Sequence, residues 1–362
     1  MRIVHLSDIH LSKSNYEEFK NTYREALIRD LLEFNSPKKI DIIVITGDLV
    51  DKGGNSLYEI EGFENKESYP NLYNIFEEIF RNPIIKALNF SKENFLFVPG
   101  NHDIDESQIL LKDEYEFTKK LDLTNINEHL KGNSDFKYSE RIRKFKEFEE
   151  TFHKGQTNYQ YTPNQSIYNY SFEGVSIGFL LINDSWRCRS QIFESEDKLM
   201  LGVNQFYNGL NNLKGYDTKI NIALLHHPID VFREVEELQR CLNVSNISFY
   251  LYGHYHSSKF EKQYQGSVDN CFGIRGRSSL NKINEKDSSY HPGYQIIDLD
   301  FKFHAKITAI HYRCYHYDYN HFDYDNYACK NGIDKGRSDM GMELRSDIKQ
   351  NKHTLIKSQF ES

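Results

Sequence analysis

Five short polar segments of this 362-residue chain carry side chains that could bind metal ions. In chain order the segments are SDIH, GDLVD, GNHD, HHP and GHYH, and their potential ligands are Asp8, His10, Asp48, Asn101, His226, His254 and His256. These carboxylate, imidazole and amide groups suit a divalent ion such as Mn²⁺, Fe²⁺ or Zn²⁺. Each segment alone is weak evidence, because a single Asp-x-His or Gly-Asp pair often occurs by chance.

Together, the seven groups exceed the needs of one ion. Two ions about 3.5–4 Å apart need at least one bridging ligand, and such a pair can clamp a phosphate between them. One aspartate shared by both ions would account for the seven potential ligands, so the sequence predicts a dinuclear site. The pair His254 and His256 leaves an alternative open: on a continued strand both would face one ion, whereas a turn after Gly253 would free them to face two.

Each polar segment follows an apolar run typical of a buried strand. These runs cover residues 2–6, 41–46, 95–98, 220–225 and 247–252. Helical spacing recurs between them, at 14–34, 71–88, 204–213 and 231–242, and Ser14 with Glu17 predicts a capping box for the first of these helices. Alternating strands and helices predict an α/β fold, in which ligands bind beyond the carboxyl ends of parallel strands.

The remaining segments extend this core. Residues 104–163 are rich in Lys and Glu with helical periodicity, which predicts a helical insertion or cap. Strand patterns return from about 168 to 184 and from 293 to 315, so we expect a second sheet and a two-sheet core flanked by helices. The expected domain covers residues 1–322, and 323–362 form a polar C-terminal tail.

Composition excludes several classes of protein. A formal net charge of -8 argues against a uniformly basic surface for duplex nucleic acid. Five cysteines without a CxxC pair suggest neither a disulfide scaffold nor a zinc ribbon, so we expect a reducing, cytoplasmic location. The first residues lack the apolar run of a signal peptide, and the longest apolar runs are too short for a bilayer, so no membrane partner is expected.

The ordered segments resemble the calcineurin-like metallophosphoesterase superfamily, whose pattern is D-x-H, G-D-x-x-D, G-N-H-[DE], H and G-H-x-H. The resemblance covers residues 8–256 and extends to about 320. It implies a four-layer αββα fold and two ions, with manganese expected first and iron or zinc as alternatives. The implied ligands of one ion are Asp8, His10 and His256, those of the other are Asn101, His226 and His254, and Asp48 bridges the two.

The resemblance also implies roles in catalysis. His102 would lie beside the phosphate and stabilise developing charge or protonate the leaving oxygen. Asp51 would pair with His102 and fix its tautomer, the alternative being a solvated turn aspartate. A hydroxide bridging the ions would attack phosphorus in line with the leaving oxygen, without a phospho-enzyme. His227, next to the ligand His226, would lie behind the metal or face the substrate.

Two departures from the serine/threonine phosphatases bear on the substrate. Lys52 follows the GDLVD segment where those enzymes carry Arg, and GNHDID lacks a further Arg. Because Lys does not replace a bidentate guanidinium, a phosphoprotein substrate is disfavoured. The segments resemble bacterial class III cyclic-nucleotide phosphodiesterase-like proteins, so a nucleotide-type phosphodiester is the expected substrate, with His227, Arg187 and Arg189 as candidate contacts.

Three alternatives stay open. A metal-dependent nuclease acting on DNA or RNA would use basic segments such as RIRKFK, WRCR and GIRGR, although the net charge of -8 favours solvated charges there. A phosphomonoesterase could use the same ions. A non-catalytic regulatory or binding subunit on the same fold would be expected to have lost ligands, and all are present. A protein partner could bind the helical insertion or the tail.

Overall fold

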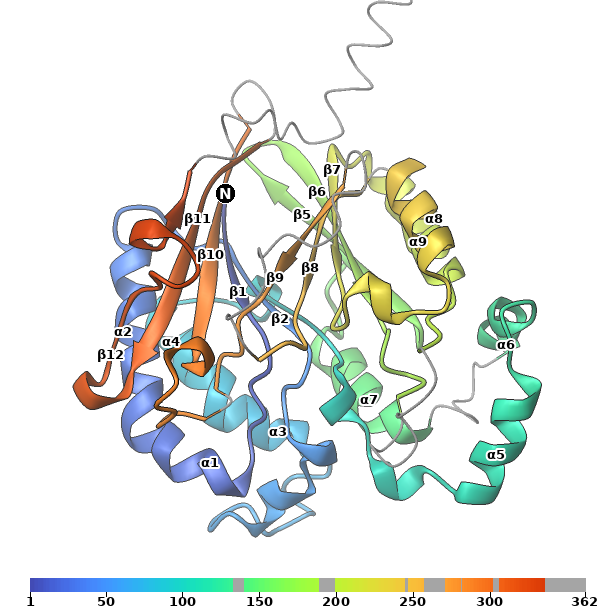
Figure 1. Ribbon diagram of the computed structural model, residues 1–362, viewed down its shortest axis with the longest axis horizontal. Coiled ribbons are helices and arrows are strands. Elements are labelled where there is room, and N and C mark those ends of the chain that lie inside the picture. Colours follow the sequence, from blue (N-terminus) through green and yellow to red (C-terminus); the bar gives the residue numbers. More distant parts are fainter. Residues whose placement is uncertain are drawn as a thin grey trace, which may run out of the picture.

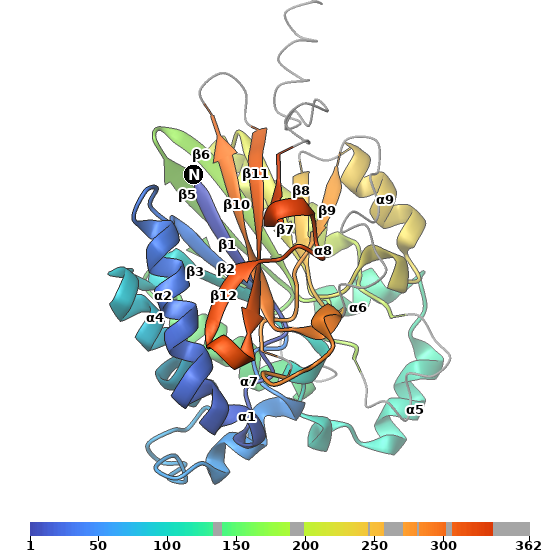
Figure 2. The same cartoon turned by 60° about the vertical axis from the view of Figure 1, so that its left-hand side comes forward.

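A computed structural model of the chain describes residues 1–132, 140–188, 199–244, 247–256, 271–280, 282–301 and 306–335. Two mixed β-sheets lie face to face, with helices on their outer faces, as Figures 1 and 2 show from two directions. This is the predicted α/β architecture with a two-sheet core.

Within the described residues the first sheet has seven strands, in the order β12-β11-β10-β1-β2-β3, with β13 paired to β11. Their bounds are β1 Arg2–Leu6, β2 Ile42–Thr46, β3 Phe95–Val98, β10 Gly293–Asp300, β11 Lys306–His316, β12 His321–Tyr324 and β13 Ile333–Asp334. Strands β1, β2 and β3 run parallel, whereas β10 pairs antiparallel with β1, and β11 pairs antiparallel with β10.

The second sheet has six strands among the described residues, in the sequential order β4 to β9. Their bounds are β4 Tyr159–Gln160, β5 Gln165–Phe172, β6 Val175–Ile182, β7 Ile220–Leu224, β8 Ile247–Tyr252 and β9 Phe272–Arg275. Strands β6 to β9 are parallel to one another. Each sheet therefore contains a parallel portion whose strands end at one common edge.

Helices cover the outer face of each sheet (Figure 1). The first layer contains α1 Lys13–Glu18, the π-helical turn Phe19–Tyr23, α2 Arg24–Asn35, α3 Tyr73–Phe76, the π-helical turn Glu77–Arg81, α4 Asn82–Leu88 and α7 Arg143–Phe152. On the second sheet lie α8 Asn204–Leu213 and α9 Val235–Val244. Together with the two sheets, these helices give the four layers that the family resemblance implies.

The apolar residues form a separate core in each space between layers. In β2 the alternation is clear: Ile42 and Val44 face the second sheet, while Ile43 and Ile45 face the helices. Strands buried on both faces need an unbroken apolar sequence, which is why residues 42–45 are all aliphatic. This burial holds the strand ends, and the loops that follow them, in fixed places.

Residues 104–163, predicted to be a helical insertion or cap, contain the helices α5, α6 and α7, and α7 belongs to the core. Helices α5 Leu111–Lys120 and α6 Ile126–Gly132 lie beside the second sheet and its helices, at the lower right of Figure 1. Asn127 accepts a hydrogen bond from the backbone N–H of Asn204 at 3.0 Å, which connects α6 to the start of α8. In α7, three phenylalanines on one face pack into the core of the first sheet.

The structure differs from the sequence expectations in how the strands are shared between the sheets and at the ends of elements. The strands at 168–184 and 293–315 were expected to form the second sheet together, but β10 and β11 pair with β1 in the first sheet, whereas β5 and β6 join β7 and β8 in the second. The first helix begins after Ser12, whose backbone N–H donates to Asn15 Oδ1 at 3.0 Å, two residues before the predicted cap at Ser14. The first sheet continues past residue 322 through β12 and β13, and buried Asp325 pairs with Arg277. Residues 336–362, the rest of the predicted tail, lie outside the described residues.

In the part of the chain that the structure describes, none of the helices combines the length and the apolar character needed to cross a membrane.

Asp298 of β10 joins the start of β1 to the neighbouring elements through a buried ionic network. Its carboxylate accepts hydrogen bonds from Arg2 Nε and Nη2, both at 2.9 Å, and from Lys38 Nζ at 2.8 Å. His311 Nε2 lies 3.0 Å away. Burial alone would raise the pKa of Asp298, but hydrogen bonds from His311, Arg2 and Lys38 outweigh it and hold the pKa well below its usual range.

The variant Asp298→Asn should lower the free energy of unfolding at pH 7 by about 3 kcal/mol, because it leaves Arg2 without its buried partner. A carboxyl group with a depressed folded pKa stabilises the protein above its unfolded pKa of about 4, and this contribution is lost as the pH falls. The difference between the variant and the wild type should therefore shrink below about pH 4. Urea unfolding at several pH values measures it.

The matched control is Asp217→Asn, whose carboxylate is 92% exposed beside Lys219 and should contribute little. Equal stabilities of Asp298→Asn and wild type at pH 7 would contradict the assignment of this network to fold stability.

Candidate metal centre

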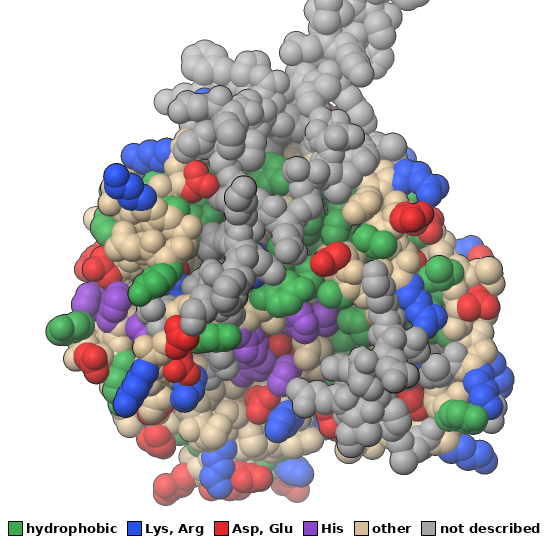
Figure 3. All heavy atoms as spheres, viewed as in Figure 1, with side chains coloured by type: hydrophobic (Ala, Val, Ile, Leu, Met, Phe, Trp, Pro, Cys, Tyr) green, Lys and Arg blue, Asp and Glu red, His purple; other side chains and the backbone are tan. Residues whose placement is uncertain are grey.

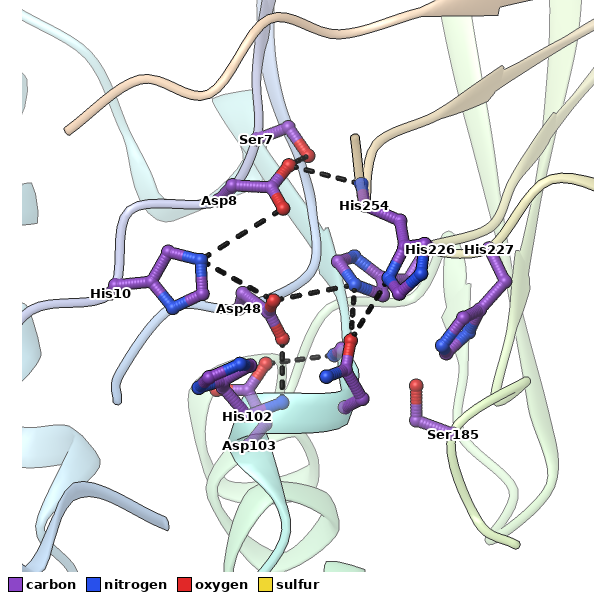
Figure 4. Close-up of polar contacts among 12 residues, drawn as sticks. Ser7, Asp8, His10, Asp48, His102, Asp103, Ser185, His226, His227 and His254 are labelled. Atoms are coloured by element: carbon purple, nitrogen blue, oxygen red, sulfur yellow. Dashed lines mark hydrogen bonds and ion pairs between the residues drawn. The ribbon is translucent and has the colours of Figure 1, made fainter. Parts of the chain in front are cut away.

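The predicted ligands come from loops that leave the carboxyl ends of parallel strands in both sheets. Asp8 and His10 follow β1, Asp48 follows β2, Asn101 follows β3, His226 follows β7, and His254 and His256 follow β8. Because the parallel portions of the two sheets end at the same edge, residues from positions 8 to 254 meet in one place (Figure 4).

The backbone is unusual where it carries these ligands. The angle φ is positive at Asp8 (50°), His10 (48°), Asp48 (53°) and His254 (75°). This left-handed conformation is unfavourable for residues with a side chain, and such strain is concentrated at functional sites. The turns thus direct polar side chains inward instead of continuing the alternation of the strand.

Two glycines permit the close approach of the loops. A Cβ atom at Gly47 (φ 88°) would lie 2.4 Å from Nδ1 of His226, and one at Gly100 would lie 2.2 Å from Oδ1 of Asp48. Any larger residue at either position would separate the ligand-bearing turns. The glycines of the GD and GNH segments are therefore required by packing at the site.

One group of side chains contains Asp8, His10, Asp48 and His256, whose ligand atoms all lie within 4.8 Å of one another. His256 Nε2 is 3.3 Å from Asp8 Oδ1, and His10 Nε2 is 3.1 Å from His256 Nε2. His10 Nε2 is also 3.5 Å from Asp48 Oδ2. Two ring nitrogens and two carboxylates thus converge on a volume suited to one cation.

A second group gathers around the amide oxygen of Asn101. His226 Nε2 lies 2.9 Å and His254 Nδ1 lies 3.1 Å from Asn101 Oδ1. Oδ2 of Asp48 is 3.3 Å from His226 Nε2. Since the same oxygen is 3.5 Å from His10 Nε2, Asp48 lies between the two groups.

The carboxylates around His226 favour a positive charge at its imidazole. Burial favours a neutral imidazole in His226, but the carboxylates of Asp48, Asp8 and Asp184 outweigh it and raise the pKa of His226 to about 10. Its Nδ1 lies 2.8 Å from the carbonyl oxygen of Thr46, so Nδ1 donates there and Nε2 faces the site. A divalent ion can take the place of the proton on Nε2.

Two further observations fit metal binding. Oδ1 of Asp8 is buried without a hydrogen-bond partner, although a buried carboxylate oxygen normally has one. Burial and the neighbouring His227 and His226 lower the pKa of His254 to about 2, so its imidazole is neutral and can donate a lone pair. The residues therefore fit divalent cations held by nitrogen and oxygen ligands.

His102 and Asp51 form a pair beside the two groups. Nδ1 of His102 is 2.7 Å from Oδ1 of Asp51, and the backbone N–H of His102 donates to Asp48 Oδ1 at 2.7 Å. Burial lowers the pKa of His102, but the hydrogen bond that its Nδ1 donates to Asp51 and the charge of Asp48 outweigh it and raise the pKa above its usual value. The side chain of His102 remains 27% exposed, so a ligand from solvent can reach it.

The site opens to solvent on one face of the molecule. Histidine side chains reach the surface near the middle of that face in the space-filling view (Figure 3). His256, at 32% side-chain exposure, and His102 are accessible, while Asp8 and Asp48 lie beneath them. The carboxylates are therefore at the bottom of the site and the exposed imidazoles at its entrance.

Two buried aspartates help to hold this geometry, although the sequence predicted no role for either of them. Asp103 accepts hydrogen bonds from the backbone N–H groups of Gly100 at 2.8 Å and Leu49 at 3.1 Å, and from the hydroxyl of Tyr73 at 3.1 Å. It fastens the GDLVD turn to the GNHD turn. The family pattern contains Asp103 as its [DE] position, but no role was assigned to it. The second, Asp184, follows β6 outside every motif.

His227, Arg187 and Arg189 were predicted to contact the substrate, and the structure gives each of them a different outcome. His227 is 2% exposed, beside His226 and His254. Arg187 is 5% exposed and forms an ion pair with buried Glu114 of α5, which also pairs with Arg141 at 2.6 Å. Arg187 thus connects α5 to the loop after β6. Arg189 lies outside the described residues.

Comparison with known proteins is consistent with this arrangement. The family model described as calcineurin-like phosphoesterase matches residues 1–258, which include all five polar segments. An uncharacterised metallophosphoesterase-like protein of Bacillus subtilis (strain 168) is 26% identical over 274 residues, covering 72% of this chain and 50% of the relative. The chain therefore spans half the length of that curated relative.

Solved structures show lower similarity. The NAD nucleotidase of Haemophilus influenzae aligns over 88% of this chain and 58% of its own, with 12% identity and a TM-score of 0.44. A calcineurin-like phosphoesterase of Bacillus subtilis aligns over 85% of this chain and 87% of its own, with 15% identity and a TM-score of 0.42.

If the buried carboxylates bind divalent cations, Mn²⁺ should stabilise the native state. At a free Mn²⁺ concentration 100 times the dissociation constant, the gain is about 2.7 kcal/mol for each ion. Thermal unfolding followed by circular dichroism, with Mn²⁺ or with EDTA, measures the shift. In Asp48→Asn, which removes the carboxylate between the two groups, the shift should be mostly lost. A full shift in that variant would contradict binding at this site.

Proposed function

The chain belongs to the calcineurin-like phosphoesterase family, and we propose that it hydrolyses a nucleotide-type phosphodiester at two divalent metal ions. The observation that carries this proposal is the position of Asp48, whose Oδ2 is 3.5 Å from His10 Nε2 and 3.3 Å from His226 Nε2. A carboxylate between two ligand groups is what a pair of ions requires.

The proposed ligands divide as the two groups do. Asp8, His10 and His256 would hold one ion, Asn101, His226 and His254 the other, and Asp48 both. Manganese is the first candidate, with iron or zinc as alternatives, because all these ligands are oxygen or nitrogen atoms. When bound, the ions would supply Lewis acidity, which orients the phosphate and makes water a nucleophile near neutral pH.

His102 is the proposed catalytic histidine. Its Nδ1 is held by Asp51 at 2.7 Å, so the proton on Nε2 is directed away from this pair and is available to the phosphate or to the leaving oxygen. The neighbouring carboxylates raise the pKa of His102, after the opposing effect of burial, and this favours the protonated form that a general acid needs. Asp51 then acts on the substrate through His102, as a positioning residue.

The buried ion pairs of two arginines favour a phosphodiester substrate over a phosphomonoester. A monoester dianion is commonly bound by guanidinium groups that make two parallel hydrogen bonds. Arg187 and Arg277 are instead buried in ion pairs with Glu114 and Asp325. Lys52, which follows the GDLVD segment, is exposed and offers a point charge only. A phosphodiester carries a single negative charge and needs less compensation from the protein.

The proposal predicts that protein loaded with Mn²⁺ hydrolyses bis(p-nitrophenyl) phosphate and a cyclic nucleotide faster than p-nitrophenyl phosphate. His102→Ala should lower kcat for the diester about 10²- to 10⁴-fold, since it removes a general acid. Asp51→Asn should have a smaller effect, about 10- to 100-fold. Initial rates at saturating substrate measure both.

The matched control is His321→Ala, which removes a histidine of β12 outside the ligand groups and should leave kcat unchanged. Faster hydrolysis of the monoester would identify a phosphomonoesterase and contradict the diester proposal. Cleavage of single- or double-stranded DNA without activity on the small diesters would support a nuclease instead.

A further inference from the structure

Asp184 occupies the loop directly after β6 and is completely buried. Its Oδ2 accepts hydrogen bonds from two consecutive backbone N–H groups, those of His226 at 2.9 Å and His227 at 2.7 Å. The same oxygen lies 3.4 Å from Nδ1 of His227. One carboxylate oxygen therefore contacts both residues of the histidine turn that follows β7.

This contact determines the path of the turn. The backbone N–H of Leu225, just after β7, still donates to Leu251 of β8 at 3.0 Å. Those of His226 and His227 lie beyond the strand pairing, and buried N–H groups need an acceptor. Asp184 provides a charged acceptor, which makes stronger hydrogen bonds than a neutral one. His226 can keep its Nε2 directed at the site only while the turn keeps this path.

The neighbouring Ser185 extends the contact to the other sheet. Ser185 Oγ lies 3.2 Å from Asp184 Oδ1 and 3.2 Å from the carbonyl oxygen of Pro99, and its hydroxyl can donate to either. Pro99 begins the turn after β3 that presents Asn101. Figure 4 shows Ser185 on the same side of the site as His227. The pair Asp184–Ser185 thus connects a turn of the second sheet with a turn of the first.

The two turns present ligands of the same proposed ion. His226 comes from the second sheet and Asn101 from the first, and His226 Nε2 is 2.9 Å from Asn101 Oδ1. Among the described residues, the ring nitrogens of His226 contact three oxygens of the first sheet and its turns. These are the carbonyl oxygen of Thr46, Oδ1 of Asn101 and Oδ2 of Asp48. None of these contacts the backbone of the histidine turn, which is held by Asp184 and by the N–H of Gly253, a donor to the carbonyl oxygen of His226 at 2.9 Å. Of these two, Asp184 is the one that connects, through Ser185, to the turn of Asn101.

We infer that Asp184, through Ser185, is a positioning residue that sets the spacing of His226 and Asn101 across the two sheets and thereby the affinity for the second ion. The inference rests on the proposed function for the existence of that ion. Residues that orient metal ligands without touching the metal typically change metal affinity about 10- to 100-fold when substituted. The effect should be selective, because Asp8, His10 and His256 have no contact with Asp184 among the interactions of the described residues.

Equilibrium dialysis of the 362-residue chain against Mn²⁺ tests the inference. Wild-type protein should bind two ions, and Asp184→Ala should weaken one of them about 10- to 100-fold while the other keeps its affinity. Asp184→Asn retains an oxygen acceptor and should recover part of the loss. Ser185→Ala should show a smaller loss in the same direction, and it keeps the test available if Asp184→Ala does not fold.

Asp30→Asn is the matched control, because Asp30 is also buried and pairs with Arg313, away from the ligand groups. It should leave both manganese affinities unchanged. A second check combines substitutions: if Asp184 acts through His226, Asp184→Asn should cause no further loss of manganese affinity in a His226→Ala background.

The outcomes separate the two claims. Wild-type protein that binds no Mn²⁺ would overturn the proposed function together with the inference. Two ions in the wild type, with unchanged or equally weakened affinities for both in Asp184→Ala, would overturn the inference alone. A selective loss of one ion that Asp184→Asn partly restores would support it.

Discussion

The structure depends on the burial of two carboxylates, those of Asp8 and Asp48, where the two sheets meet. Both side chains are almost completely removed from solvent. A buried charge costs several kcal/mol unless it is paired, and two like charges close together increase that cost. The compensating imidazoles come largely from the second sheet, so the charges of the first sheet are balanced only when the two sheets assemble.

This requirement explains why the turns are both strained and tightly held. Left-handed backbone at Asp8, Asp48 and His254 directs the side chains inward, which costs about 1–3 kcal/mol at each residue. The apolar cores on both sides of each sheet fix the strand ends. Buried aspartates then hold the turns: Asp103 fastens the loops after β2 and β3 to each other, and Asp184 fastens the loop after β7.

Much of the fold and the composition of the site could be predicted because the signals are local. An unbroken aliphatic run such as 42–45 indicates a strand buried on both faces, and a polar segment directly after it indicates the end of that strand. The short edge strands β4, β9, β12 and β13 were missed, since they have two to four residues and little apolar pattern. Their pairing is decided by the neighbouring strand rather than by their own sequence.

Other features depend on contacts distant in sequence. Asp184 and His226 are 42 residues apart, and a backbone hydrogen bond to a carboxylate leaves no pattern in the residues between them. Arg187 lies three residues after Asp184 in the loop that follows β6, yet its guanidinium turns to Glu114 of α5. The direction of a long side chain is set by the packing around it, which composition and spacing do not contain.

The central claim is that Asp48 lies between two metal ions at the junction of the sheets. The most direct test is anomalous X-ray diffraction from crystals grown with Mn²⁺, recorded at the manganese absorption edge. The account predicts two anomalous peaks, one among Asp8, His10 and His256 and the other among Asn101, His226 and His254, with the carboxylate of Asp48 in contact with both. A single peak, or peaks away from Asp48, would contradict it.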